Sequence, residues 1–112
     1  MSRERFVIRS GRRVRFVRAD DIDWVEAQGD YVGLHVGRDC FLLRDTIAAM
    51  ERTLEPLSFA RIHRSSIVNL DSVVELRSVD NGDYKVLLRT GAELRLSRSY
   101  RGHVERLVGG RL

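Results

Sequence analysis

Cysteine, proline and lysine are nearly absent from this chain, and long apolar runs are absent altogether. Each of the three residues occurs once in 112, as Cys40, Pro56 and Lys85. A single cysteine cannot form an internal disulfide or a cysteine-based zinc site, and it agrees with a reducing compartment, so we expect a cytoplasmic protein. No apolar stretch could cross a bilayer or form the core of a signal peptide, so no membrane association is expected.

Motifs for catalysis and cofactor binding are also missing. The sequence has neither the nucleophile turn G-x-S-x-G nor the phosphate-binding patterns G-x-G-x-x-G and G-x-x-x-x-G-K-[ST]. The three histidines, His35, His63 and His103, are far apart and have no cysteine or carboxylate pair at metal-ligand spacing. We therefore expect no enzymatic activity, no cofactor and no metal site.

Positive charge is present, but it is concentrated in patches of arginine. The net charge is +4, yet residues 1–18 carry seven arginines against one glutamate, and residues 19–57 carry three arginines against nine acidic residues. Further basic clusters occur at residues 61–64 and 95–106. The guanidinium group suits phosphates and the acceptor pair of guanine, so this pattern favours nucleic-acid binding, although arginine in place of lysine is also typical of GC-rich genomes.

The chain length and the hydrophobic periodicity predict one mainly β domain over residues 1–112. Apolar residues alternate in segments 6–8, 14–16, 22–28, 31–36 and 40–44, and turn residues such as Gly29-Asp30 separate them. Further strands are expected at 73–79, 84–89 and 93–96, with Asn81-Gly82 in a hairpin turn.

Two or three short helices complete the prediction. Asp45 or Thr46 is a suitable N-cap for a helix over residues 46–54, which Pro56 ends, and Ser97 or Ser99 could cap a last helix. Residues 57–70 fit neither the strand nor the helix period for long, so we expect an irregular segment there with one or two helical turns.

Three side chains with possible chemistry have simpler structural interpretations. Cys40 lies in a predicted strand, where burial as a small apolar residue is favoured over a redox-sensing role. Trp24 is expected to anchor the core and not to stack on a nucleic-acid base. His35 is expected to be partly buried.

Two segments combine apolar anchors with cationic and hydroxyl donors, the groups that contact phosphate. The first is residues 59–70 (FARIHRSSIVNL), which offers Arg61, His63, Arg64, Ser65 and Ser66. The second is residues 96–101 (LSRSYR), which follows a strand and opens a helix, so backbone N–H groups, hydroxyls and guanidiniums could converge on an anion.

In order along the chain, these motifs resemble the LytTR family of bacterial DNA-binding domains. Residues 22–32 (IDWVEAQGDYV) are similar to the family's I-x-[YW]-[IV]-E-A-x-G-N-Y-[VT], residues 59–70 to F-x-R-[IV]-H-[RK]-S-x-[IL]-V-N-L, and residues 96–100 (LSRSY) to [LV]-S-R-[SR]-[YF]. The resemblance covers about residues 5–108. Departures are mild: Ala60 and Ser66 replace larger residues, and Gly33 interrupts the fourth strand.

The resemblance implies an elongated domain of several small antiparallel sheets that meets double-stranded DNA through loops. Base readers would come from the turn between Gln28 and Tyr31, from Arg64 and from Arg98. His63 would either donate to phosphate or lock its loop by internal hydrogen bonds, the role we favour, and Asn69 would be structural. The candidate DNA-contacting residues are Gln28, Asp30, Tyr31, Arg61, His63, Arg64, Ser65, Ser97, Arg98, Ser99, Tyr100 and Arg101.

The same resemblance implies a response regulator that bends DNA at direct repeats about one helical turn apart. We expect an excised output domain, monomeric in solution and paired on DNA, with a receiver or other sensing domain in the full-length protein. The cluster Arg12, Arg13, Arg15 and Arg18 is expected to face solvent or that partner domain.

Two other functions are compatible with the composition. A protein-interaction or oligomerisation domain could pair through exposed strand edges, with the arginines merely solvating its surface. Single-stranded nucleic-acid binding on a β platform ranks last, because aromatic residues make up only 7% of the chain.

Overall fold

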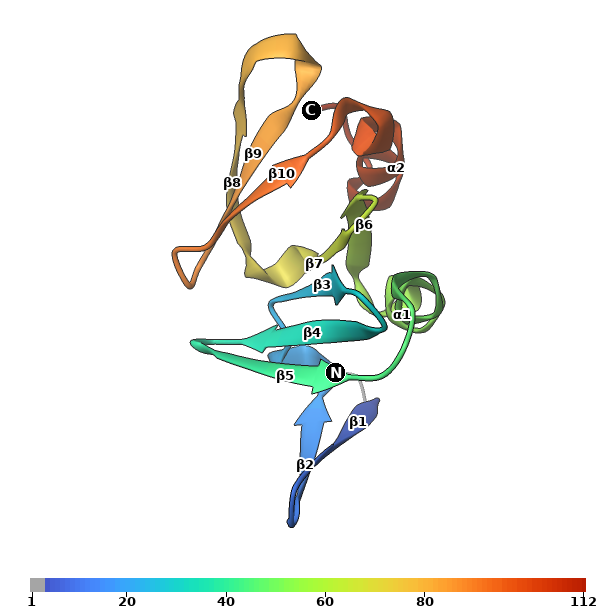
Figure 1. Cartoon of the computed structure of the whole chain (residues 1–112). Coiled ribbons are helices and arrows are strands. Elements are labelled where there is room, and N and C mark those ends of the chain that lie inside the picture. The colour runs from blue at the N-terminus through green and yellow to red at the C-terminus, as the bar shows by residue number, and fades with distance from the viewer. Residues whose placement is uncertain (1–3) are drawn as a thin grey trace.

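The computed structural model describes residues 4–112, which form three antiparallel sheets in succession along one long axis (Figure 1). Its extents of 46 × 28 × 24 Å confirm the expected elongated, mainly β architecture. No helix in the described residues is long and apolar enough to span a membrane.

The elements follow one another with short connections. An N-terminal hairpin pairs β1 (Arg5–Ser10) with β2 (Arg13–Arg18), and a five-stranded sheet has the order β5-β4-β3-β7-β6. Its strands are β3 (Trp24–Gln28), β4 (Tyr31–Val36), β5 (Asp39–Leu43), β6 (Phe59–His63) and β7 (Ser66–Asn69). The last sheet, β10-β9-β8, contains β8 (Val73–Ser78), β9 (Tyr84–Leu88) and β10 (Glu93–Leu96).

Two helices pack beside these sheets. Helix α1 (Ile47–Leu54) begins at Thr46, whose hydroxyl accepts a hydrogen bond from the Ala49 amide at 3.0 Å, as the sequence predicted. A 3₁₀ turn at Glu55–Leu57 follows it, and Ser58 reverses the chain into β6 with a φ of 68°. Helix α2 (Arg98–Val108) closes the fold and ends at Gly109 in the left-handed region.

The β6–β7 hairpin separates two hydrophobic cores. Phe59 and Ile67 belong to the core formed with the N-terminal hairpin, β3, β4 and α1. Their neighbours Ala60 and Val68 belong to a second core with β9, β10 and α2. Successive residues of a strand point to opposite faces, so this hairpin is buried on both sides.

This double burial explains an incorrect prediction. Residues 57–70 were expected to be irregular with helical turns, and they form β6 and β7 instead. A strand buried on both faces carries apolar residues without alternation, and a register shift between Arg61 and His63 disturbs the period further.

Asn69 ties the hairpin to the start of the five-stranded sheet, in agreement with its expected structural role. Its side chain is 4% exposed, its Nδ2 donates to the Ile22 carbonyl at 2.9 Å, and its Oδ1 accepts from the Asp71 amide at 3.0 Å.

We predict that Asn69→Ala lowers the free energy of unfolding by about 1–3 kcal/mol, because two backbone groups lose their buried partner. Urea denaturation monitored by circular dichroism measures this difference. Thr53→Ala, at an exposed position of α1, serves as the control. Equal midpoints for Asn69→Ala and wild type would contradict the assignment.

Candidate nucleic-acid interface

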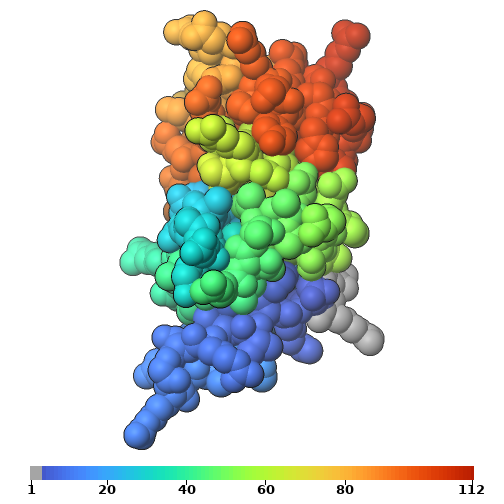
Figure 2. Space-filling model, turned by 45° about the vertical axis from the view of Figure 1, so that its right-hand side comes forward, coloured from blue at the N-terminus to red at the C-terminus, as the bar shows by residue number. Residues whose placement is uncertain are grey.

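The three segments that the sequence singled out lie next to one another. The Ala27 amide donates to the Ser65 carbonyl at 2.9 Å, which joins the end of β3 to the β6–β7 turn. The Ser97 amide donates to the Ile62 carbonyl at 2.9 Å, which joins the start of α2 to β6. Figure 2 shows these segments stacked along the long axis, from light blue through yellow-green to orange.

Arg61 holds this arrangement from within. Its Nε donates to the His63 carbonyl at 2.8 Å, its Nη2 donates to the Arg64 carbonyl, and its Nη1 pairs with Glu51 of α1 at 2.8 Å. The guanidinium also lies 5.9 Å from the ring centre of Tyr100 in α2. Only 12% of the side chain is exposed, so the structure gives Arg61 internal partners where the sequence predicted a phosphate contact.

His63 and Ser65 lock the same turn. Nδ1 of His63 lies 2.9 Å from the Ser65 hydroxyl and accepts a hydrogen bond from the Ser65 amide at 3.2 Å. This is the loop-locking role favoured for His63 from the sequence. The turn therefore presents the exposed side chain of Arg64 from a fixed backbone.

The N-terminus of α2 already holds an anion, the carboxylate of Asp83. Its Oδ1 accepts from the Arg98 amide at 3.1 Å, and its Oδ2 pairs with Arg95 at 2.7 Å. The hydrogen bond from the Arg98 amide lowers the pKa of Asp83, and the Arg95 guanidinium lowers this pKa further. Asp83 was not among the residues predicted from the sequence. It lies 15 residues before Arg98, in the connection between β8 and β9.

This carboxylate positions Arg98 without occupying its side chain. The Arg98 guanidinium is exposed; no hydrogen bond or close ion pair holds it within residues 4–112, although its charge also helps to lower the pKa of Asp83. Ser97 occupies the N-cap position of α2 but makes no capping bond, and its hydroxyl lies 3.1 Å from that of Ser99. The predicted convergence of backbone N–H groups on an external anion is therefore replaced by an internal contact.

Tyr100 and Arg101 of α2 are both engaged by contacts within the protein, although 41% of the Arg101 side chain is exposed. Tyr100 is partly buried against the second core. Arg101 donates to the Leu112 carbonyl at 2.8 Å, lies 3.5 Å from the Glu105 carboxylate, and stacks over Tyr84 at 5.5 Å. These contacts favour a structural contribution from both residues.

The β3–β4 turn presents Gln28, Asp30 and Tyr31 at the surface. Gln28 folds back along the sheet, where its Nε2 donates to Glu26 at 3.2 Å. Gly33 allows this, because a Cβ at that position would lie 2.6 Å from the Gln28 Nε2. The glycine that interrupts the strand pattern therefore makes room for a candidate base reader.

Arg44 is a further candidate that the sequence analysis missed. Its exposed guanidinium lies 5.9 Å from the ring centre of Tyr31, beside a shallow hollow lined by Gly29, Asp30, Asp45 and Thr46. Arg44 lies in the segment between β5 and α1. It was not predicted because the charged residues of 19–57 are mostly acidic and include no cluster of arginines.

Three further predictions concern side chains of the five-stranded sheet. The prediction for Cys40 is wrong, and those for Trp24 and His35 agree with the structure. Cys40 is exposed, not buried, because it lies on the uncovered face of the edge strand β5, whereas Phe41 and Leu43 on the other face pack against the N-terminal core. Partial desolvation raises the pKa of its thiol, and the charge of Glu26 raises it further, which disfavours the reactive thiolate. Trp24 packs against the second core and His35 is partly buried, as expected. The two rings stack with their centroids 4.0 Å apart.

Comparison with known proteins points to one family. A family model described as the LytTr DNA-binding domain matches residues 12–109. The sensory transduction protein LytT of Bacillus cereus is 28% identical over 92 residues, covering 82% of this chain and 37% of that protein. The transcriptional regulatory protein BtsR of Escherichia coli K12 is 31% identical over 100 residues, covering 87% of this chain and 40% of BtsR.

A solved structure confirms the fold. A LytTr DNA-binding domain from Bacillus cereus superposes with a TM-score of 0.86 at 18% identity, covering 96% of this chain and 99% of that domain. The curated relatives are longer proteins, since this chain spans only 37% to 41% of the LytT and BtsR proteins it matches.

We predict that Arg61→Lys lowers the free energy of unfolding by about 1–3 kcal/mol, because one ammonium cannot replace three directed guanidinium contacts. Chemical denaturation gives the difference, and Arg52→Lys on the exposed side of α1 is the matched control. Stability unchanged by Arg61→Lys would show that the charge alone suffices.

Asp83→Asn tests the internal anion through pH. Because the folded-state pKa of Asp83 is lowered, its contribution to stability is present above the ordinary carboxyl pKa and is lost as pH falls through the folded value. The difference in free energy of unfolding between wild type and Asp83→Asn should therefore be largest near neutral pH and shrink below about pH 4. Asp80→Asn is the control; a difference independent of pH would contradict the carboxylate's role.

Proposed function

The chain belongs to the LytTR family, whose members are DNA-binding domains of bacterial response regulators and not enzymes, and we propose that it reads double-stranded DNA through its loops. The observation that supports this most directly is the pair of free guanidiniums, Arg64 and Arg98, on segments joined by hydrogen bonds. Their backbones are held by contacts from Arg61 and Asp83, so little backbone entropy is lost when the two side chains engage a ligand, and the remaining cost is the rotamer freedom of the side chains themselves.

Arg98 and Arg64 are the proposed base readers. A guanidinium at a loop tip can donate to O6 and N7 of guanine together in the major groove, a contact worth about 1–3 kcal/mol of discrimination. Asp30, Tyr31 and Arg44 would contact the adjacent stretch of duplex, and Gln28 would need to leave Glu26 before reaching a base. Ser97 and Ser99 would donate to phosphates.

Arg61, His63, Ser65, Tyr100 and Arg101 would act indirectly in this proposal. Their hydrogen bonds and packing hold the two reader segments. Replacing them should therefore weaken binding through stability and loop order, and the salt dependence of binding should change little.

The shape of the domain supports contact with more than one groove. Its long axis of 46 Å exceeds the roughly 34 Å of one helical turn of B-DNA. Loops that read successive major grooves from one side would favour a bent duplex, and sites repeated about one turn apart would suit two copies side by side. Monomers in solution that pair on direct repeats are part of this proposal.

The full-length protein would place this domain in the cytoplasm under the control of a receiver or other sensing domain. This part rests on the greater length of the LytT and BtsR relatives. The arginine-rich β1–β2 hairpin, at the opposite end of the molecule from α2, would face solvent or that domain (Figure 1).

A role in protein interaction is the second candidate, and one observation favours it. The same hairpin exposes Phe16 to 70% and Val14 to 50%. Apolar side chains this accessible suit a protein partner, and such a contact is compatible with DNA binding at the other end.

We predict that selection from random duplex DNA at near-physiological salt enriches a motif with wild type, and that Arg98→Ala or Arg64→Ala relaxes one position of it. The loss should correspond to about 1–3 kcal/mol at that position. Arg13→Ala removes the same charge from the exposed β2 strand and is the matched control.

The control should recover the wild-type motif with at most a uniform loss of affinity. If wild type enriches no motif and its binding only decays with salt, the reader assignment fails. Loss of self-association or partner binding on Phe16→Ser, without any change in DNA affinity, would support the interaction surface.

A further inference from the structure

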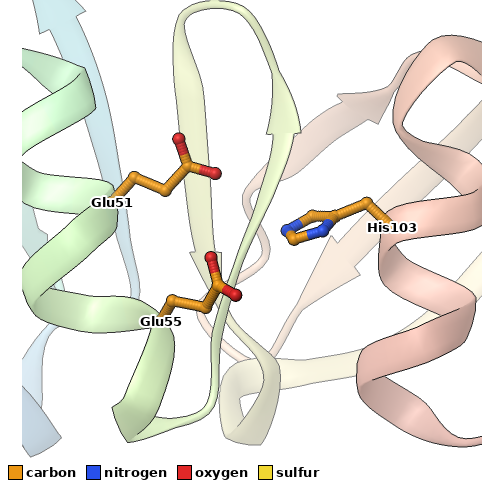
Figure 3. A group of neighbouring side chains, drawn as sticks. All are labelled: Glu51, Glu55 and His103. Atoms are coloured by element: carbon orange, nitrogen blue, oxygen red, sulfur yellow. The ribbon is translucent and has the colours of Figure 1, made fainter.

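Three metal-ligating side chains converge on the side of the molecule where α1 and α2 face each other. Glu51 and Glu55 come from the end of α1, His103 comes from the middle of α2, and one ligand atom of each lies within 4.8 Å of the others. Figure 3 shows the imidazole ring directed toward the two carboxylates. Among the residues that the structure describes, this is the one group of three such atoms at this spacing.

The imidazole contributes a buried nitrogen that lacks a partner. Nε2 of His103 is inaccessible to solvent and makes no hydrogen bond to the described part of the chain. A buried polar atom without a partner is energetically unfavourable, so it calls for an explanation such as a bound ion.

The carboxylates are also poorly placed without a cation. Glu51 and Glu55 are four residues apart, where like charges repel, and Glu55 is the C-cap of α1. The C-terminal end of a helix carries partial negative charge and disfavours anions. Arg61 pairs with one oxygen of Glu51, which leaves the other Glu51 oxygen and the exposed Glu55 to be balanced.

We propose that Glu51, Glu55 and His103 bind a divalent first-row transition-metal ion, with Zn²⁺ as the representative probe. One imidazole nitrogen and two carboxylates are ligands that Zn²⁺ accepts, and water would complete the coordination. Ligand atoms bound at ~2.1 Å lie about 3–4 Å apart, so small side-chain rotations would close the present spacing.

The surrounding structure suits such a site. The Arg61 contact at 2.8 Å would orient the Glu51 carboxylate, the kind of hydrogen bond that metal-ligating carboxylates receive. A bound ion would clamp α1 to α2 across β6. The expectation of no metal site considered only local spacing, whereas His103 lies 48 residues beyond Glu55 and the fold alone brings them together. The proposal does not depend on DNA binding.

Isothermal titration with ZnCl₂ in a non-coordinating buffer tests the proposal, with Co²⁺ absorption in the visible range as a second readout. Wild type should bind one ion per chain and gain thermal stability. Glu55→Gln and His103→Gln should each weaken binding by about tenfold or more and abolish the Co²⁺ spectrum. Because Glu55 is exposed, its variant should fold as wild type does, which circular dichroism without metal checks.

Two control variants exclude other sites. Cys40→Ser removes the exposed thiol near His35, and Glu75→Gln neutralises an exposed glutamate on β8; both should bind as wild type does. Absence of Zn²⁺ and Co²⁺ binding by wild type would overturn the proposal. The proposal would also be overturned if Glu55→Gln bound Zn²⁺ as tightly as wild type, or if Cys40→Ser alone abolished Zn²⁺ binding.

Discussion

The β6–β7 hairpin is the element on which the rest of the structure depends, because it is the common wall of two cores. Phe59 and Ile67 face the N-terminal core, while Ala60 and Val68 face the C-terminal one. Neither core is closed without it. In a chain of 112 residues with one cysteine and no disulfide, two small cores that share a wall bury more apolar surface than two separate ones could.

The shared wall also organises the candidate nucleic-acid interface. Arg61 leaves the hairpin on the side of α1, and its guanidinium ties Glu51, the turn carbonyls and Tyr100 together. Asp83, in the β8–β9 hairpin, holds the backbone of Arg98 by accepting a hydrogen bond from its amide. In both cases a charged side chain is used inside the protein, and a neighbouring arginine is exposed at the surface.

Much of the fold could be predicted from the sequence, and the failures have physical causes. Period-two alternation and turn residues located the strands with one solvent-facing side, such as β1, and Thr46 marked the start of α1. The β6–β7 hairpin was missed because double burial removes alternation. Cys40 was placed inside because nothing local indicates that β5 is an edge strand.

The candidate site was predictable as a set of segments but not as a set of roles. The ordered motifs identified the three loops, whereas contacts between distant residues decide which arginines are free. Asp83 and Arg98, or Glu55 and His103, meet only after the sheets and helices are assembled.

The hairpin has a consequence for the dynamics of the turn that carries Arg64. If either half of the domain opens, one face of β6–β7 is exposed to water, so the halves lose stability together and the hairpin should be among the last elements to exchange its amide protons. Binding loops usually belong to the least stable parts of a protein. Here the turn that carries Arg64 extends from a pair of strands expected to open slowly, so the proposed contact with DNA would be made by a preformed turn.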